Sequence, residues 1–291
     1  KGEKILPAGF FITVLATTGV LIVLALLSVF LPVNDLNIAG MTMSVYNLIS
    51  QYILIIGSIV ALVFLAVAGN EKRAAAGLTR QNWKSAVLIV LAFVGIYIVR
   101  TVVSVAVQGV SDGSGMQYVK EWAAMFKNPM MWLNIAALPI NYFFVFIAFF
   151  GEEYGWRYYL QPVLQKRFGL RAGVIILGVV WGLWHIPDDL FYYTQTSGIQ
   201  MIFAQQITCI SLGIFFAYAY MKTQNIWVPV CLHYLNNNLI PIISGTFSAD
   251  VLENQTVSWK DLPVALVLNG LCFGFFLLAD VFKKKEVQEE E

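Results

Sequence analysis

The sequence predicts an all-α fold, a polytopic transmembrane bundle of about eight helices. Of the 291 residues, 59% are hydrophobic and only 12% are charged, whereas soluble domains carry about 25% charged residues. The apolar residues form runs of roughly 20 residues, the length that crosses a bilayer. The lysines and arginines collect in alternate loops, as the positive-inside rule requires. Lipid is therefore expected to be the main solvent of this chain.

The individual spans follow from these runs. The first is too long for a signal-peptide core and no small-residue cleavage site follows it, so it is predicted to be retained. The fifth run is short, and the seventh is interrupted by His233 and by three consecutive asparagines. Polar residues at membrane depth persist only when they are buried in protein or face a wet cavity. The predicted spans are Gly9–Leu31, Ile49–Gly69, Ala86–Val107, Met131–Phe150, Ala172–Ile186, Gln200–Met221, Ile226–Ile243 and Pro263–Phe282.

The loop charges predict the orientation. With eight spans and a cytoplasmic N-terminus, fourteen of the 18 Lys and Arg residues lie inside, and Lys120, Lys127 and Lys260 lie outside. Arg100 lies within the third span. Both termini are therefore expected in the cytoplasm. The formal net charge of +1 provides no basic field for nucleic acid, so none is expected as a partner.

Ionisable residues gather at three places in or beside the predicted spans. Each such residue costs about 2.5–3.5 kcal/mol or more at the bilayer centre, so it marks a candidate functional site. Both histidines of the chain fall within these places. The three segments are Glu152-Glu-Tyr-Gly-Trp-Arg157, Trp181-Gly-Leu-Trp-His185 and His233-Tyr-Leu-Asn-Asn237.

Helical spacing suggests roles for these side chains. Glu153 and Arg157 are four residues apart, so they share a helix face and can pair. Glu152 points about 100° away from that face and is a candidate general base. His233 and Asn237 also share a face. With His185 from a third helix, the set can activate water and stabilise an oxyanion, which predicts an intramembrane active-site cavity.

Each of these features also has a purely structural interpretation. Glu153 and Arg157 could form a structural ion pair, and a histidine at a helix end could simply be hydrogen-bonded there. His233 and Asn237 could join helices by hydrogen bonds. These interpretations weaken jointly, because they do not explain why both histidines occur at the three sites.

The ordered motifs Glu-Glu-x-x-x-Arg, aromatic-x-x-x-His and His-x-x-x-Asn resemble the CPBP family. This family contains CAAX-processing endopeptidases and the Abi proteins of bacteriocin processing and self-immunity. The resemblance covers about residues 131–243 and implies that Glu152 and His185 activate water. It further implies that His233 and Asn237 form the oxyanion hole, while Glu153 and Arg157 brace the site. One departure is Trp181, where the family usually has Phe, and this residue preserves an aromatic wall.

The resemblance divides the chain at residue 131. Residues 1–130 would form three N-terminal spans with their loops, and 131–291 the catalytic membrane core with a short cytoplasmic tail. A zinc ion held by Glu152, His185 and His233 is one alternative. The sequence has no HExxH motif, and Asn237 beside His233 suits hydrogen bonding better than ligation, so a metal-free mechanism with no cofactor is favoured.

The expected function is intramembrane cleavage of a peptide bond in a membrane-associated protein or peptide precursor. A bacterial cell membrane is expected, so a peptide precursor such as a bacteriocin is favoured over a prenylated CAAX protein. The alternative within the family is a non-catalytic self-immunity protein or regulatory membrane scaffold. A transporter that uses the same buried charges is disfavoured because no inverted repeat is visible. The sequence does not indicate the oligomeric state.

Overall fold

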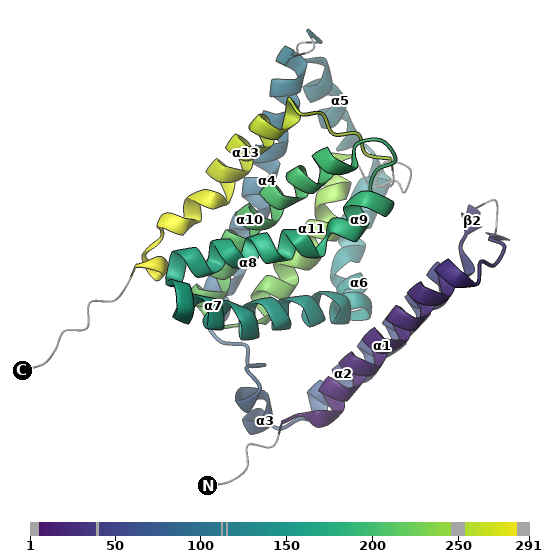
Figure 1. Ribbon diagram of the computed structural model, residues 1–291, viewed down its shortest axis with the longest axis vertical. Helices are drawn as coiled ribbons and strands as arrows, with labels where there is room; N and C mark the ends of the chain where they lie inside the picture. The colour runs from purple at the N-terminus through teal and green to yellow at the C-terminus, as the bar shows by residue number, and fades with distance from the viewer. Residues whose placement is uncertain (1–5, 39–40, 112, 115, 246–253, 284–291) are drawn as a thin grey trace, which may run out of the picture. The chain divides into compact units, whose positions relative to one another are not determined.

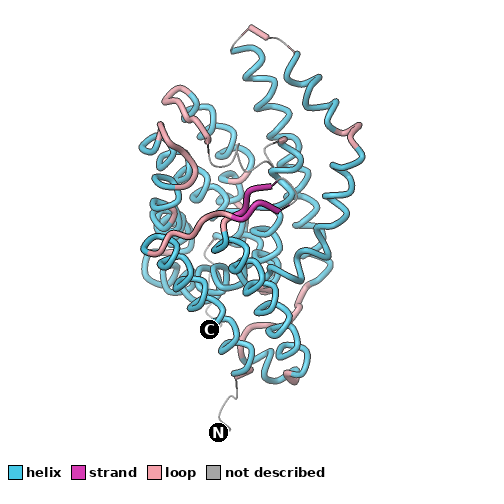
Figure 2. Tube along the Cα trace, turned by 90° about the vertical axis from the view of Figure 1, so that its right-hand side faces the viewer, coloured by secondary structure: helices cyan, strands magenta, loops and turns pink. Residues whose placement is uncertain are grey.

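The computed structural model describes residues 6–38, 41–111, 113–114, 116–245 and 254–283 (Figure 1). Both ends of the chain, which the charge pattern assigns to the cytoplasm, lie outside these ranges. The described chain is almost entirely helical, as the sequence predicts. A short antiparallel pair of strands, β1 (Leu36–Ile38) and β2 (Met41–Met43), was not predicted. It is drawn in magenta in Figure 2.

Within the described residues, six helical segments are long and apolar enough to cross a membrane. They overlap the first six predicted spans, although most ends differ by several residues and the fourth segment ends 18 residues later than predicted. The fourth is the longest, because the helix that begins at Pro129 continues through Glu152 and Arg157 to Phe168. The segments are Ala8–Phe30, Val45–Val67, Trp83–Val110, Pro129–Phe168, Leu170–Phe191 and Gly198–Thr223.

The seventh and eighth predicted spans are helical but do not meet the same standard of length and apolar composition. Helix α11 (Trp227–Ser244) contains a histidine and three asparagines, which lower its hydropathy. Helix α13 (Asp261–Cys272) is short and is followed by two 3-10 segments, η2 (Gly274–Leu278) and η3 (Asp280–Phe282). The number of eight spans therefore stays a prediction, whereas the polytopic helical fold is confirmed.

The chain forms two compact units. The first contains residues 1–79 and 137–153, and the second contains residues 80–136 and 154–291. This division reflects packing, whereas the division of the sequence at residue 131 reflects motifs and stays a prediction.

In the first unit, α1 (Ala8–Phe30) and α2 (Val45–Val67) run side by side (Figure 1). Their packing depends on a glycine: a Cβ atom added at Gly57 would lie within 3.0 Å of three side-chain atoms of Thr17. Small residues of this kind let membrane helices approach closely. The unit also contains the short helix α3 (Asn70–Ala75) and residues 137–153 of α6 (Pro129–Glu153), where Phe150 packs edge-on against Phe10 at 4.9 Å.

The second unit is built around α10 (Gly198–Thr223), the most buried of the six spans. Helix α8 (Leu170–Trp184) crosses it closely, because Gly178 lies against the backbone of Ile210. Helices α4 (Trp83–Ser111), α11 and α13 pack on other sides of α10. Phe93, Phe215 and Phe273 join three of these helices in one aromatic core.

A π-helical turn follows the two glutamates. Segment η1 (Tyr154–Leu160) interrupts the regular α-helix between α6 and α7 (Gln161–Phe168). Single π-helical turns inside α-helices occur frequently at functional sites, because they redirect side chains without ending the helix. Here the turn carries Arg157, which is fully buried.

Candidate active site

A cavity of about 370 Å³ lies inside the second unit. Three of the four predicted catalytic residues line it, namely His185, His233 and Asn237, together with the predicted aromatic wall residue Trp181. These side chains come from α8 and α11, which are separated by about 50 residues of sequence. The other lining residues are Tyr192, Tyr193, Met201, Gln205, Thr208, Cys209, Leu212, Asn236, Pro241 and Gln255.

His185 lies at the junction between α8 and the short helix α9 (Ile186–Phe191). Pro187 explains the break, because proline lacks an N–H and its ring excludes a regular helix on its N-terminal side. Proline is instead favoured in the first turn of a helix, where it stands in α9. The break leaves the imidazole at the end of α8 beside the cavity.

A hydrogen bond defines how His185 can act. Its Nδ1 lies 2.9 Å from the backbone oxygen of Trp181. Because a carbonyl oxygen only accepts, Nδ1 must carry the proton and donate. In the neutral imidazole, Nε2 is then the unprotonated nitrogen. It can accept a hydrogen bond from a water molecule in the cavity, which is what a water-orienting histidine must do.

Trp181 connects the two histidines and the buried arginine. Its ring lies 5.8 Å from the ring of His185 and 5.5 Å from that of His233, both edge-on. The guanidinium of Arg157 lies 5.3 Å from the Trp181 ring and 5.5 Å from the ring of Phe216. Arg157 Nη1 also donates to the carbonyl oxygen of Gly213 at 3.2 Å. The arginine therefore fixes the wall against which both imidazoles rest.

His233 and Asn237 face the same cavity from α11, as their helical spacing predicts. The His233 side chain is buried, whereas Asn237 is exposed and lines the cavity. Pro241 stands four residues after Asn237 and has no N–H to donate to the Asn237 carbonyl, so the helical hydrogen-bond ladder is interrupted at this level. The interruption occurs beside the residues that would hold an oxyanion.

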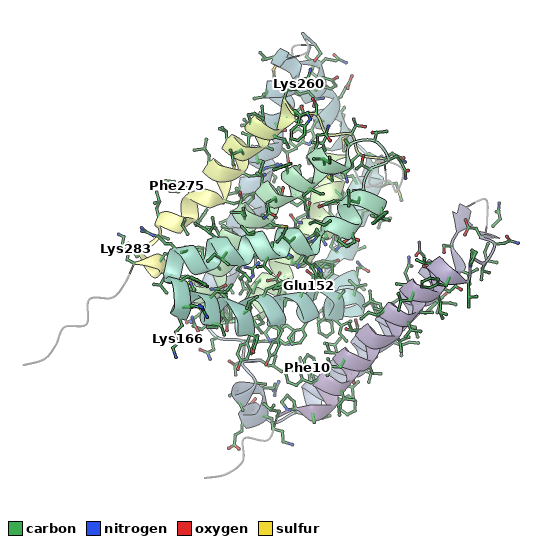
Figure 3. All side chains as sticks on the ribbon, viewed as in Figure 1. Phe10, Glu152, Lys166, Lys260, Phe275 and Lys283 are labelled. Atoms are coloured by element: carbon green, nitrogen blue, oxygen red, sulfur yellow. The ribbon has the colours of Figure 1, made fainter. Side chains whose placement is uncertain are left out.

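The structure assigns Glu152 and Glu153 to the first unit, at the last turn of α6. Glu152, labelled in Figure 3, is partly buried, and Glu153 is fully buried. In the sequence, the pair precedes Arg157 by five and four residues. The extension of this helix to Phe168 moves the glutamates away from the helix end, as a site at membrane depth requires.

Sequence reasoning missed several residues of the cavity. Gln205, Thr208 and Cys209 project from one face of α10, at the i, i+3, i+4 spacing of a helix. Polar residues at this spacing within an apolar span were a usable signal. Gln255 gave no signal, because it lies in the loop between the last two predicted spans and reaches the cavity only through tertiary structure. Its backbone N–H donates to the carbonyl oxygen of Tyr193 at 2.9 Å.

Tyr193 contributes a neutral hydroxyl to the cavity. Burial, followed by the nearby carboxylates of Asp188 and Asp189, raises the pKa of this phenol to about 12. Tyr193 therefore keeps its proton throughout the physiological range and can act only as a neutral donor or acceptor. It is not a candidate base for water activation near neutral pH.

The cavity lining provides two imidazoles and the thiol of Cys209. Catalytic zinc takes three protein ligands and an open position. Among the described residues, no group of three His, Cys, Asp or Glu side chains is close enough to hold a metal ion. The metal-free mechanism stays a prediction.

Comparison with known proteins adds to this geometry. Residues 134–239 match the family described as Rce1-like, type II CAAX prenyl endopeptidases. This match supports the family prediction. The matched range includes all four predicted catalytic residues and lies inside the range predicted from the motifs.

A curated relative gives the same indication. The chain is similar to CAAX prenyl protease 2 of Methanococcus maripaludis, with 27% identity over 125 residues. These residues are 40% of this chain and 45% of the relative, so the chain spans less than half of the length of that protein. No solved structure matches the chain.

Proposed function

We propose that this CPBP-family protein is an intramembrane endopeptidase that hydrolyses a peptide bond in a membrane-associated polypeptide. One observation supports the proposal most strongly: His185, His233 and Asn237 line a single cavity between membrane helices, and the Nδ1 hydrogen bond of His185 leaves Nε2 as an acceptor. A structural interpretation of the motifs does not require these groups to converge on one cavity.

The proposed reaction begins with water activation. Glu152 takes a proton from a water molecule whose other hydrogen is held by Nε2 of His185. The resulting hydroxide oxygen attacks the carbonyl carbon of the scissile bond. The role of Glu152 is based on the sequence motif and on the family match. A carboxylate is a suitable base for this step when it is within reach of the water.

The second half of the reaction needs oxyanion stabilisation. As the carbonyl oxygen becomes negative, the His233 ring and the Asn237 side-chain amide donate hydrogen bonds to it. The carbon–nitrogen bond then breaks, and protonated Glu152 returns its proton to the leaving amine. The products are a new carboxyl terminus and a new amino terminus, so one water molecule is consumed.

The cavity wall indicates the substrate class only broadly. Met201, Leu212 and Pro241 provide apolar contacts, whereas Gln205 and Gln255 provide amides that can bind a peptide backbone. This mixture suits an extended polypeptide with apolar side chains or an attached lipid. The descriptions of the matched family and of the matched protein both contain the word prenyl, and the proposal covers prenylated proteins and unmodified peptide precursors alike.

The test compares cells that produce the wild-type protein or Glu152→Gln at equal levels. New amino termini in isolated membranes are mapped by mass spectrometry. Glu152→Gln preserves shape and removes the base, so cuts that depend on the wild-type protein should be nearly abolished. Asn237→Ala removes one oxyanion donor and should lower the rate about 10²–10³-fold.

A matched pair of synthetic probes then defines the substrate. A farnesylated CAAX peptide and the same peptide without the farnesyl group are offered to the purified protein in proteoliposomes. Turnover by Glu152→Gln within a few fold of wild type would exclude Glu152 as the base. If no cut in cell membranes depended on the wild-type protein, and neither peptide were cleaved, the endopeptidase proposal would be wrong.

A further inference from the structure

The Asn237 amide takes part in a chain of hydrogen bonds that begins on another helix. Asn236 Nδ2 donates to Asn237 Oδ1 at 2.9 Å. The hydroxyl of Tyr97 on α4 donates to Asn236 Oδ1 at 2.5 Å. All three residues belong to the second unit, and both asparagines line the cavity.

The direction of these bonds determines which way the Asn237 amide faces. An asparagine side chain has one accepting oxygen and one NH2 group with two donors. The side-chain oxygen of Asn237 accepts the hydrogen bond from Asn236. The NH2 group of Asn237 is therefore the end of the amide that takes no part in this chain of hydrogen bonds. An oxyanion hole requires donors aimed into the cavity, and the chain therefore sets the amide in the useful orientation.

The position of Tyr97 is itself restrained. Its ring is 5% exposed and packs at 4.9 Å from Phe93 and 5.0 Å from Phe273. Aromatic contacts of this kind fix the ring, so the hydroxyl has a defined place. A hydroxyl held in this way can position its partner better than a mobile one.

Arg100 gives this arrangement a second restraint. Its guanidinium lies 5.8 Å from the Tyr97 ring, and its Nε donates to Asn269 Oδ1 on α13 at 2.7 Å. An arginine within a membrane helix is costly, which marks such a residue as functional by default. Arg100 has no role in the proposed reaction. Its contact with the Tyr97 ring gives it a structural role, because it helps to hold Tyr97 in place.

We infer that Tyr97 and Asn236 are positioning residues that hold the Asn237 amide toward the oxyanion, by a hydrogen-bonded chain from α4 to α11. The inference rests on the proposed function and adds two residues to its site. Tyr97 lies outside the segment that matches the family. Neither residue touches the reacting atoms in this mechanism, since both act through Asn237.

The experiment uses the full chain in proteoliposomes. The probe is the peptide that the wild-type protein cleaves: the farnesylated CAAX peptide, its unfarnesylated counterpart, or a peptide spanning a mapped membrane cut. Tyr97→Phe removes one hydroxyl, and Asn236→Asp still accepts from Tyr97 but cannot donate to Asn237. Each should lower kcat at least about tenfold while KM changes less than twofold, because an oxyanion donor acts in the transition state.

Two controls separate positioning from general structural damage. Tyr218→Phe removes a hydroxyl from the same core, where Tyr218 packs 4.9 Å from Phe276, and should leave kcat unchanged. In an Asn237→Ala background, Tyr97→Phe should reduce the rate less than twofold further, because residues that act as a unit are not additive. A fully multiplicative loss would show that Tyr97 acts independently of Asn237 and would overturn the inference.

The outcomes also distinguish this inference from the proposed function. If Asn237→Ala is slow and Tyr97→Phe keeps a wild-type kcat, the positioning chain is wrong and the reaction stands. If Asn237→Ala itself keeps a wild-type kcat, or no peptide is cleaved, the oxyanion role fails and the inference fails with it. A crystal structure of Tyr97→Phe with an unchanged Asn237 amide would also contradict the chain.

Discussion

At the scale of single residues, the site depends on which hydrogen bonds each polar side chain has already made. His185 commits Nδ1 to the Trp181 carbonyl, and Asn237 commits its oxygen to Asn236. One acceptor and one NH2 group are left for chemistry. A reaction that develops negative charge on a substrate oxygen needs both kinds of group, the first for water and the second for the oxyanion.

The first prediction concerns Arg157. This side chain is fully buried, and its guanidinium lies over Trp181 while Nη1 donates to the Gly213 carbonyl. Arg157→Ala should lower the free energy of unfolding by at least about 1.5–3 kcal/mol, the usual value of a hydrogen bond to a charged group. Activity should fall as well, because Trp181 supports both histidines.

The measurement is thermal or denaturant unfolding in detergent. Arg171→Ala serves as the control, since Arg171 is exposed and its removal should change stability little. Equal stability of Arg157→Ala and Arg171→Ala would show that Arg157 does not brace the cavity.

A second prediction concerns metal removal. The cavity offers two imidazoles, and the proposed mechanism uses a carboxylate, two imidazoles and an amide without a metal. Protein treated with a chelator should keep its activity, and elemental analysis should find well under one zinc per chain. Loss of activity that zinc alone restores would refute this mechanism and would favour ligation by Glu152, His185 and His233.

The sequence was most informative at this residue scale. It indicated His185, His233, Asn237 and Trp181, because polar or aromatic groups at helical spacing stand out in an apolar chain. It could not indicate Tyr97, because tyrosine is an ordinary residue of membrane helices. Only the packing of α4 against α11 brings its hydroxyl to Asn236.

At the scale of elements, close contact between α8 and α10 positions the cavity. A Cβ atom at Gly178 would lie 2.6 Å from the Cα of Ile210, a backbone atom that cannot turn aside. Gly95 on α4 is exposed and has open space around it. The same substitution can therefore be compared at a crowded glycine, Gly178, and at an open one, Gly95, within one unit.

Their substitution by alanine should have opposite effects. Gly178→Ala should force α8 away from α10 and destabilise the protein by about 1–3 kcal/mol, as overpacking does. Gly95→Ala should stabilise it by up to about 0.5–1 kcal/mol, because alanine favours a helix. Unfolding in detergent measures both. Destabilisation of similar size by both substitutions would mean that glycine at 178 has no special packing role.

Sequence patterns predicted the helices but not all of the residues at which they end. Apolar length located the first six spans. The π-helical turn at Tyr154–Leu160, which carries the buried Arg157, had no sequence signal. The end of α13 at Cys272 was also missed, since the residues that follow it are equally apolar.

At the scale of the whole molecule, the division into two compact units could not be predicted, because it depends on long-range packing. Residues 137–153 of α6 pack in the first unit, and the chain directly after them packs in the second. Hydropathy detects each span separately and contains no information on which spans pack together. The motifs therefore did not indicate that Glu152 and Glu153 pack in the first unit, whereas His185 and His233 pack in the second.

The last prediction concerns the orientation in the membrane. Within the second unit, Lys166 and Lys283 lie at one end and Lys260 lies at the opposite end (Figure 3). The charge distribution assigns the end with Lys166 and Lys283 to the cytoplasm, because positive residues are retained on that side. Lys166→Cys should therefore react with an impermeant maleimide only after the membrane is opened, whereas Thr256→Cys, which is exposed near Lys260, should react in intact cells. Protein without an introduced cysteine controls for Cys231 and Cys272, which are partly buried. Labelling of Lys166→Cys from outside would reverse the orientation of this unit and would place the positively charged end on the side that the charge rule excludes.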